Sequence, residues 1–232
     1  MIANLYLLTL PAIKLTVEST QNPAQFSTLL QILLLLTVLS VAPALLLMLT
    51  SFTRLVIVFS ILRHALGLQQ TPPNQVLISL ALFLTFFIMS PVFQEVYKQA
   101  IQPYLKKEID EKTLFERASL PFKNFMLKNT REKDLALFIK LRGEERPKSK
   151  EEISLLTLIP AFMISELKTA FQIGFLLYVP FLVIDIVVSS VLISMGVLML
   201  PPTMISLPLK LLLFVLVDGW NLLVMSLVKS FY

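Results

Sequence analysis

Two long stretches in the first hundred residues carry no charged side chain, and they restrict the possible folds more than any other feature. One runs from Ala24 to Thr53 and the other from Ala65 to Gln94. About 20 apolar residues suffice for an α-helix to cross the hydrocarbon core of a bilayer. Hydrophobic residues make up 56% of the chain and charged residues only 15%, which is too little charge to cover a soluble protein of this size. The sequence therefore predicts an all-α integral membrane protein.

Most of the charge lies in one middle stretch. Residues 98–152 hold 14 of the 20 Lys and Arg residues and 10 of the 15 Asp and Glu residues. Apolar residues recur near helical spacing between these charges, which predicts a small helical region that faces water. We therefore divide the chain into an N-terminal arm or signal-like segment (1–23), a first apolar helical block (24–96), the charged helical region (97–152) and a second apolar hairpin block (153–232).

Prolines indicate that the apolar helices are broken. Residues 155–200 are too long for one span, and they contain Pro160 and Pro180. Proline removes a backbone hydrogen bond and kinks a helix, so these two prolines are predicted to divide the segment. The expected result is a set of broken apolar helices and helical hairpins with four spans in all.

The basic residues predict an orientation. With four spans, the short first loop carries Arg54 and Arg63. The positive-inside rule places this loop in the cytoplasm, and both termini and the charged middle region outside. Arg54 and Arg63 are interpreted as topology determinants whose long side chains reach the lipid head groups. Arg131, in the charged middle, is grouped with them as a topology or interface residue.

Charged residues within the second apolar block are the main candidates for functional side chains. A charge at the centre of a membrane helix costs about 2.5–3.5 kcal/mol, so such a residue is expected to face a partner or a cavity. If the hairpin turns at Pro201–Pro202, Lys210 has no partner at its own level. Two alternatives stay open: the charges pair within the fold, or they bond between subunits or line a water-filled path. The candidates are Glu166, Lys168, Asp185, Lys210 and Asp218.

Glu166 and Lys168 stand two residues apart. Side chains at this spacing do not face each other on a helix. They are therefore expected to act as two separate anchors rather than as a pair.

Several function classes find no support in the sequence. The chain has no cysteine and a single histidine, His64, so a site with zinc-type ligand spacing is not expected. Basic residues are mixed with acidic ones, which argues against nucleic acid as a partner. No G-x-S-x-G, P-loop or G-x-G-x-x-G motif occurs. The prediction is a protein that is not an enzyme and that uses no metal and no cofactor.

The segment SMGVLMLPPTMISLPLK, residues 194–210, is more elaborate than a hairpin turn requires. Met195, Met199 and Met204 flank Pro201–Pro202. Methionine is a flexible and polarizable filler, and apolar constrictions can close a pore to water and ions. The methionines therefore serve either as ordinary apolar packing or as a soft constriction, formed when symmetric copies bring their loops together.

Four strings in order carry a resemblance to one family, namely LTSFTRLVIVFSILRHALGLQQTPPNQVLISLALFLTFFIMSPVF, TREKDLALF, PAFMISELKTAFQIGF and PLKLLLFVLVDGW. Together they resemble the FliP family of flagellar biosynthetic proteins, which has counterparts in virulence type III secretion. The resemblance covers roughly residue 40 to the C-terminus. The string LGLQQTPPNQ favours the flagellar branch.

This resemblance implies a non-enzymatic subunit of the flagellar protein export gate. Several copies would form a ring with FliQ-type and FliR-type membrane proteins, through which unfolded flagellar subunits pass. The expected location is the bacterial inner membrane at the flagellar basal body, in contact with lipid, with the charged middle region extracytoplasmic. The helices would form a closed assembly lifted out of ordinary spanning geometry. The alternative from the residues alone is a multi-pass transporter of small solutes or ions, in which broken helices are also expected.

The resemblance also implies roles for individual residues. The loop before the double proline is methionine-rich in the family and forms a gasket around the export channel. The matching positions here are Val197, Leu198 and Met199, so the constriction would be apolar with one methionine among these three. Lys210 falls in the family's P-x-K motif and Asp218 in its V-D-G-W motif. The pore-loop candidates are thus Met195, Val197, Leu198, Met199, Pro201, Pro202 and Met204.

Overall fold

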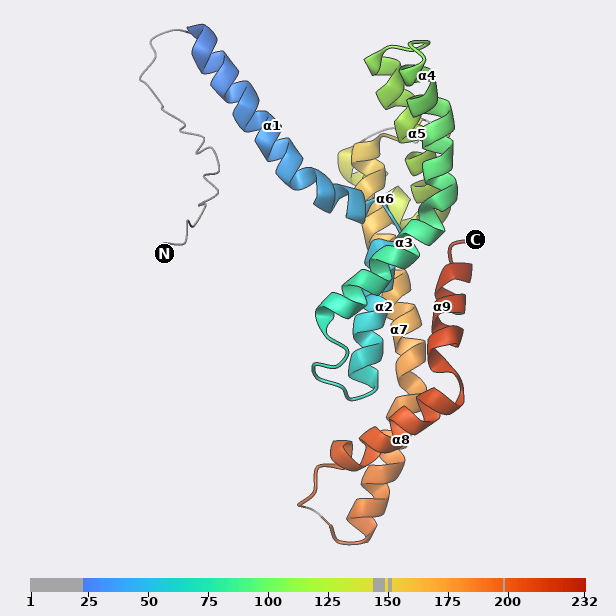
Figure 1. Cartoon of the computed structure of the whole chain (residues 1–232). Helices are drawn as coiled ribbons and strands as arrows, with labels where there is room; N and C mark the ends of the chain where they lie inside the picture. The colour runs from blue at the N-terminus through green and yellow to red at the C-terminus, as the bar shows by residue number, and fades with distance from the viewer. Residues whose placement is uncertain (1–22, 144–148, 150–151, 198) are drawn as a thin grey trace, which may run out of the picture. The chain divides into compact units, whose positions relative to one another are not determined.

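A computed structural model describes residues 23–143, 149, 152–197 and 199–232. These residues form helices joined by short turns, with no strand among them (Figure 1), which confirms the predicted all-α fold. The helices are, in chain order, α1 (Pro23–Met48), α2 (Phe52–Ala65), α3 (Asn74–Val96), the π-helical turn η1 (Tyr97–Ile101), α4 (Gln102–Leu105), α5 (Glu111–Asn129), α6 (Glu132–Arg142), α7 (Leu155–Ser194), α8 (Pro202–Leu216) and α9 (Gly219–Lys229). The predicted N-terminal arm or signal-like segment lies outside the described residues, apart from Pro23.

The chain consists of two units, Met1–Pro43 and Ala44–Tyr232. The described part of the first unit belongs to α1, where the side chains of Leu34 and Leu39 are exposed by 67% and 66%. A helix that is apolar all round needs lipid or a protein partner as its surroundings. The second unit contains the rest of the first apolar block, the charged helical region and the second apolar block, and these form one compact body.

Two of the described helices are long and apolar enough to cross a membrane. They are the continuous run Asn74–Leu105, which joins α3, η1 and α4, and Leu155–Ser194, which is α7. A third span results if α8 and α9, which bend by 65° at their junction, are counted together. Our count of four is therefore larger than the two or three spans of the described residues. The expected first span lies on α1, whose described apolar part, Leu30–Val41, is shorter than a span.

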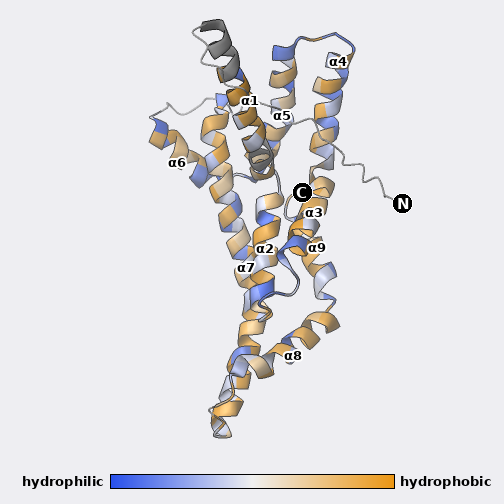
Figure 2. Cartoon of the chain, turned by 60° about the vertical axis from the view of Figure 1, so that its left-hand side comes forward, coloured by the Kyte–Doolittle hydropathy of each residue, from blue (hydrophilic) through white to orange (hydrophobic). Residues whose placement is uncertain are grey.

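The helix α7 corrects the predicted breaks at Pro160 and Pro180. Both prolines lie inside one continuous helix of 40 residues. At 1.5 Å per residue such a helix is about 60 Å long, roughly twice the thickness of the hydrocarbon core. Proline is tolerated in a packed helix because neighbouring groups satisfy the freed carbonyl. The helix α7 packs against α5 and α6 as well as against α2 and α8, so it connects the charged region with the other apolar helices (Figures 1 and 2).

The core of the second unit is centred on α2, which packs against α3 and α7. Leu55, Val58 and Phe59 of α2 are fully buried. The contact with α7 is very close, because a Cβ atom added to Gly174 would lie 2.4 Å from Cδ1 of Ile61. The short helix α2 is thus an internal element rather than the exposed connecting segment that we inferred between two spans.

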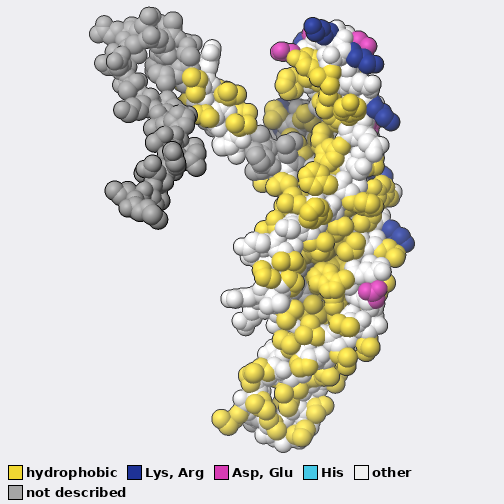
Figure 3. Space-filling model, viewed as in Figure 1, with side chains coloured by type: hydrophobic (Ala, Val, Ile, Leu, Met, Phe, Trp, Pro, Cys, Tyr) yellow, Lys and Arg dark blue, Asp and Glu magenta, His cyan; other side chains and the backbone are white. Residues whose placement is uncertain are grey.

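The charged middle region is helical, as predicted, and it consists of α5 and α6 with the turns around them. Charged side chains gather at the end of the unit formed by α4 and α5, whereas hydrophobic side chains dominate the rest of the face in view (Figure 3). Asp110 caps α5, because its Oδ1 accepts a hydrogen bond of 3.1 Å from the Thr113 amide. The side-chain and backbone hydrogen bonds of Thr113 lower the pKa of Asp110 below its ordinary value of 3.8. The predicted boundary at residue 97 falls within the continuous helix Asn74–Leu105.

Candidate functional site

The loop between α7 and α8 begins at a glycine. Gly196 has φ +74°, and the Val197 amide donates a hydrogen bond of 3.0 Å to the Leu192 carbonyl. This is a Schellman motif, in which a left-handed residue ends a helix and satisfies its last carbonyls. The loop ends at Pro202, the first residue of α8, where proline's fixed φ suits a helix start. The double proline therefore starts a helix instead of forming the centre of the turn.

The methionines of this loop do not pack into the core of their own chain. Met199 is 96% exposed, and Met195 and Met204 are 71% and 69% exposed. Val197 is half-buried and Pro201 is exposed, whereas Leu198 lies outside the described residues. The loop thus presents apolar, adaptable side chains to something other than its own chain.

The start of α8 lies next to the connection between α2 and α3. A hollow of about 290 Å³ is lined by residues 67–71 on one side and by Thr203, Met204 and Leu207 on the other. Residues 67–71 belong to the LGLQQTPPNQ string. This string therefore borders the first turns of α8.

Lys210 is buried and has a partner at its own level, contrary to our expectation. Its Nζ lies 2.6 Å from Oδ2 of Asp185 and donates a hydrogen bond of 3.1 Å to the Ala65 carbonyl. Ser206 donates a hydrogen bond of 2.6 Å to Oδ1 of the same aspartate. Asp185 stands nine residues before the end of α7 and Lys210 eight residues after the start of α8. The predicted turn at Pro201–Pro202 is too late in the chain, because α7 already ends at Ser194. For this reason the sequence did not match Lys210 with Asp185.

Asp218 marks a break between two helices, α8 and α9, within the second apolar hairpin block. It adopts φ +49° at the junction of α8 and α9, and its side chain is exposed. The rings of Phe214 and Trp220 meet edge to face at 5.5 Å across the junction. A Cβ atom on Gly219 would lie 2.3 Å from the Phe214 ring. The 65° bend therefore has a packed inner side.

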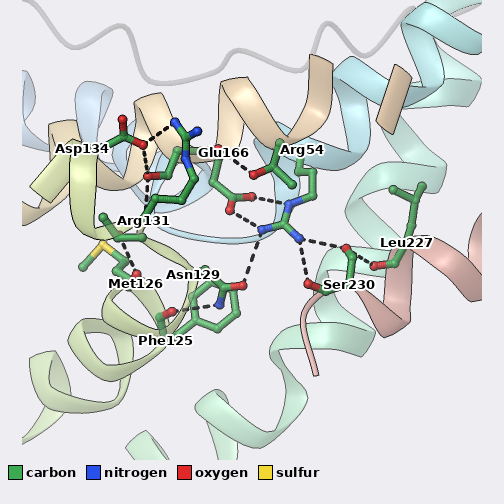
Figure 4. Close-up of polar contacts among 12 residues, drawn as sticks. Arg54, Phe125, Met126, Asn129, Arg131, Asp134, Glu166, Leu227 and Ser230 are labelled. Atoms are coloured by element: carbon green, nitrogen blue, oxygen red, sulfur yellow. Dashed lines mark hydrogen bonds and ion pairs between the residues drawn. The ribbon is translucent and has the colours of Figure 1, made fainter. Parts of the chain in front are cut away.

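Arg54 forms a buried ion pair with Glu166 (Figure 4). Their side chains are 3% and 0% exposed. Nε of Arg54 donates a hydrogen bond of 2.9 Å to Oε2 of Glu166, and Nη2 donates to Oε1, so the pair is bidentate. Our interpretation of Arg54 as a residue that reaches the head groups is corrected, because an acidic side chain on α7 holds it in the core.

The remaining donors of Arg54 face the end of the chain. Nη1 donates to the Ser230 carbonyl at 3.0 Å and to Oγ of Ser230 at 2.8 Å. Nη2 also lies 3.5 Å from Oδ1 of Asn129, on α5. The guanidinium carbon stands 3.7 Å from the centre of the Phe231 ring. Four segments of the chain therefore meet at Arg54.

Arg131 belongs to a second polar cluster that joins α6 to α7 (Figure 4). Its side chain pairs with Asp134, and its backbone amide donates a hydrogen bond of 3.0 Å to Oγ of Ser165. Ser165 in turn donates to Oδ2 of Asp134 at 2.6 Å. Partial burial acts to raise the pKa of Asp134, but hydrogen bonds from Ser165 and Arg131 outweigh it and lower the pKa below 3.8.

The other predicted charges lie nearer the surface. Arg63 is half-buried, and its Nη1 donates hydrogen bonds to Oδ1 of Asn74 at 2.6 Å and to the Pro72 carbonyl at 3.3 Å. Lys168 is exposed, whereas Glu166 is buried, so these two residues face different sides of α7, as their spacing implied. Arg63 thus fastens the α2–α3 connection, and Lys168 stays available to surrounding molecules.

Sequence reasoning missed the neutral members of these clusters. Asn129, Ser230 and Phe231 carry no charge and stand in no motif that we singled out, and Ser165 lies in the PAFMISELKTAFQIGF string without having been singled out there. One signal could have pointed to them: a charge buried in an apolar helix requires several hydrogen-bond partners. Within the described residues, no group of three or more His, Cys, Asp or Glu side chains is placed to hold a metal ion.

The fold and these clusters define an all-helical membrane protein in which two internal ion pairs, Arg54–Glu166 and Asp185–Lys210, join α7 to α2 and to α8, and in which the α7–α8 loop exposes apolar side chains. The model of the FliP family matches residues 35–227. The flagellar biosynthetic protein FliP of Bacillus subtilis (strain 168) is 56% identical over 217 residues, which cover 94% of this chain and 98% of that relative. FliP of Aquifex aeolicus (strain VF5) is 53% identical over 204 residues, 87% of this chain and 85% of that relative. The chain belongs to the FliP family.

Proposed function

We propose that this chain is a ring-forming core subunit of the flagellar type III protein export gate, and that its α7–α8 loop lines the channel for unfolded flagellar subunits. The name of its relatives, flagellar biosynthetic protein FliP, supports a role in building flagella and in flagellar protein export. The observation that carries the channel-lining role is the loop itself. Its Met199 is 96% exposed, although methionine is a residue that usually packs.

A ring explains why the loop is apolar and why both of its ends are fixed. The Schellman motif at Gly196 fixes the end of α7, and the Asp185–Lys210 pair holds α8 against α7. Copies arranged around an axis would bring equivalent loops together, so that the methionines pack on one another. A closed apolar constriction of this kind excludes water and ions, and flexible methionines can separate when a polypeptide passes.

The proposed partners follow from the same arrangement. They are further copies of the chain, FliQ-type and FliR-type membrane proteins, lipid, and unfolded export substrates. The extensive exposed apolar surface of α7 and α8, which includes Phe175, Leu176 and Leu216, is suited to lipid and to neighbouring subunits. The proposed location is the bacterial inner membrane at the flagellar basal body, with α5 and α6 extracytoplasmic. The proposed role is non-enzymatic.

A transporter of small solutes or ions is the weaker candidate. The break between α8 and α9 is a feature that such transporters share. Their midplane charges, however, bind the transported ion or solute. In this chain Arg54 and Lys210 are already held by Glu166 and Asp185, which favours a structural role for these charges.

The channel-lining role can be tested by making the loop polar. Replacing Met199 by Ser should make the closed complex, assembled with its FliQ-type and FliR-type partners, leaky to ions. Conductance is measured across a planar bilayer that contains the purified complex. The matched control is Met225→Ser, at an exposed position on α9 outside the loop, and it should leave the conductance low. A Met199→Ser complex that assembles normally and stays tight would contradict the proposal.

A further inference from the structure

The last residues of the chain make more specific contacts than a helix end requires. Phe231 is 4% exposed, and its ring stacks on the ring of Phe125 with 6.1 Å between centroids and 19° between planes. The guanidinium of Arg54 also lies over this ring, 3.7 Å from its centre. The Phe231 ring is therefore in contact with a cation from α2 and with an aromatic ring from α5.

Both neighbours of Phe231 are also held. Ser230 receives two hydrogen bonds from Arg54, at 2.8 and 3.0 Å. The hydroxyl of Tyr232 donates a hydrogen bond of 3.3 Å to the Ile88 carbonyl on α3, and its backbone carbonyl lies 3.5 Å from Nζ of Lys128 on α5. Three consecutive residues thus contact three different helices, α2, α3 and α5.

We propose that Arg54 forms a docking site for the chain's own C-terminal tail, Ser230–Tyr232. Glu166 fixes Arg54 in this site, Phe125 and Asn129 complete the site, and the docked tail holds α9 in place. Glu166 binds Nε and Nη2, which form one edge of the guanidinium, so the remaining Nη1 donor is directed at Ser230 of the tail (Figure 4). The flat face of the cation covers the Phe231 ring. Arginine suits this task, because it can bind a carboxylate in two places while it stacks on a ring.

The docked tail affects the position of α9. Leu223 and Leu227 bury one face of this helix, and the tail contacts extend that face beyond its end. At the other end of α9 the chain bends by 65° into α8, the helix that follows the pore loop. The docked tail therefore fastens the far end of the loop-bearing hairpin to α5, in the charged middle region. This inference does not depend on the proposed export role.

Cysteine cross-linking in the full-length protein tests the docking. The chain has no cysteine, so the double variant Lys128→Cys with Tyr232→Cys carries the only thiols. These two positions are neighbours, because Nζ of Lys128 lies 3.5 Å from the backbone carbonyl oxygen of Tyr232. A short bismaleimide should bridge them within one chain, and intact mass distinguishes one bridging reagent from two separate adducts. Bridges between two chains, seen as dimers on a denaturing gel, would overturn docking within the chain.

Added substitutions show whether the site holds the tail. Phe231→Ala removes the cation–π contact and the buried ring, and the bridged fraction should fall about fivefold or more. Leu222→Ala truncates an exposed side chain on α9. It is the matched control and should leave bridging unchanged. Arg54→Lys keeps a positive charge beside Glu166 but loses the fork, and it should reduce bridging as well. Bridging that survives Phe231→Ala would overturn the proposal.

Hydrogen exchange separates release of the tail from general unfolding. In Phe231→Ala the amides at the end of α9 should exchange faster, whereas those of α2 and α7 keep their protection. Unchanged exchange at the end of α9 would show that the tail does not hold this helix. Faster exchange throughout the unit would show a general loss of structure and would also overturn the proposal.

Discussion

Arg54 illustrates what a buried arginine requires. Each of its three nitrogens has an acceptor, supplied by Glu166, Asn129 and Ser230, and its flat face covers the Phe231 ring. Removing a guanidinium from water costs several kcal/mol, and a paired carboxylate with further hydrogen bonds offsets most of this. The burial of Arg54 therefore depends directly on Glu166.

This dependence gives a prediction for Glu166. Glu166→Leu leaves Arg54 buried without its carboxylate, and it should lower the free energy of unfolding by about 3–5 kcal/mol. The double variant Arg54→Met with Glu166→Leu leaves no unpaired charge and should recover much of the loss. Unfolding is followed by circular dichroism in a denaturant titration of the detergent-solubilised protein.

Lys168 supplies the control for this experiment. It lies two positions from Glu166 on the same helix but is exposed, so Lys168→Leu should change the free energy of unfolding by no more than about 0.5 kcal/mol. A Glu166→Leu effect as small as that of Lys168→Leu would show that the Arg54–Glu166 pair does not stabilise the fold.

The role of Arg54 could not be predicted from its neighbours in the sequence. An arginine beside an apolar stretch is typical of a topology determinant, and its carboxylate partner lies 112 positions away. The spacing of Glu166 and Lys168, in contrast, is local, and it correctly indicated two different faces of α7. Sequence patterns predict where a side chain stands on its own helix, but not which distant helix packs against it.

At the scale of elements, the crossing of α2 and α7 depends on one missing side chain. Gly174 lies inside α7, where Ile61 of α2 occupies the space that a Cβ atom would need, at 2.4 Å. Glycine normally weakens a helix by about 1 kcal/mol relative to alanine. Its presence here lets the two backbones approach and brings the α2 core residues against α7.

The prediction for this crossing is that Gly174→Ala destabilises the protein, although alanine favours helix. Overpacking of a tight core costs about 1–3 kcal/mol, which exceeds the helix-propensity gain. Adding Ile61→Ala removes the two nearest atoms, Cδ1 at 2.4 Å and Cγ2 at 2.9 Å, and should restore part of the stability, with the same denaturant titration as the measurement. A Gly174→Ala variant that is as stable as the original chain would show that α2 and α7 can move apart without cost.

Helix breaks were the hardest elements to predict from sequence. Pro160 and Pro180 indicated breaks in α7, yet the helix is continuous through both. The break between α8 and α9 occurs at Asp218 with no proline at the junction, and the packing of Phe214, Gly219 and Trp220 accompanies it. Proline removes one hydrogen bond and crowds the carbonyl of the preceding turn, but packed neighbours can compensate for this, so tertiary packing decides whether the helix breaks. The helical nature of every block, in contrast, followed from composition and periodicity.

At the scale of the whole molecule, three polar clusters join regions that are far apart in the sequence. Arg54–Glu166 joins α2 and α7, Arg131–Asp134 with Ser165 joins α6 and α7, and Asp185–Lys210 joins α7 and α8. All three include α7, the helix that passes from the charged region to the α7–α8 loop. Loss of one cluster should therefore affect the position of the loop as well as local stability.

The cluster nearest the loop gives a prediction for assembly. Lys210 is 3% exposed and binds Asp185 and the Ala65 carbonyl, whereas Lys229 is exposed near the chain end. Lys210→Ala removes the cation that holds α8 against α7 and leaves a partly buried carboxylate. Because Asp185 is 22% exposed, water reduces the penalty, and we expect a loss of about 1–3 kcal/mol. Lys229→Ala should cost within about 0.5 kcal/mol.

Complex yield and secretion in living cells provide the measurement for this prediction. Lys210→Ala should lower the amount of assembled complex on a native gel and the flagellar subunits released to the medium, whereas Lys229→Ala should leave both unchanged. The double variant Lys210→Ala with Asp185→Ala tests the physical reason, because it leaves no unpaired charge and should assemble better than Lys210→Ala alone. Equal defects for Lys210→Ala and Lys229→Ala would show that the α7–α8 pair does not set the position of the loop, and that positive charge alone matters at both sites.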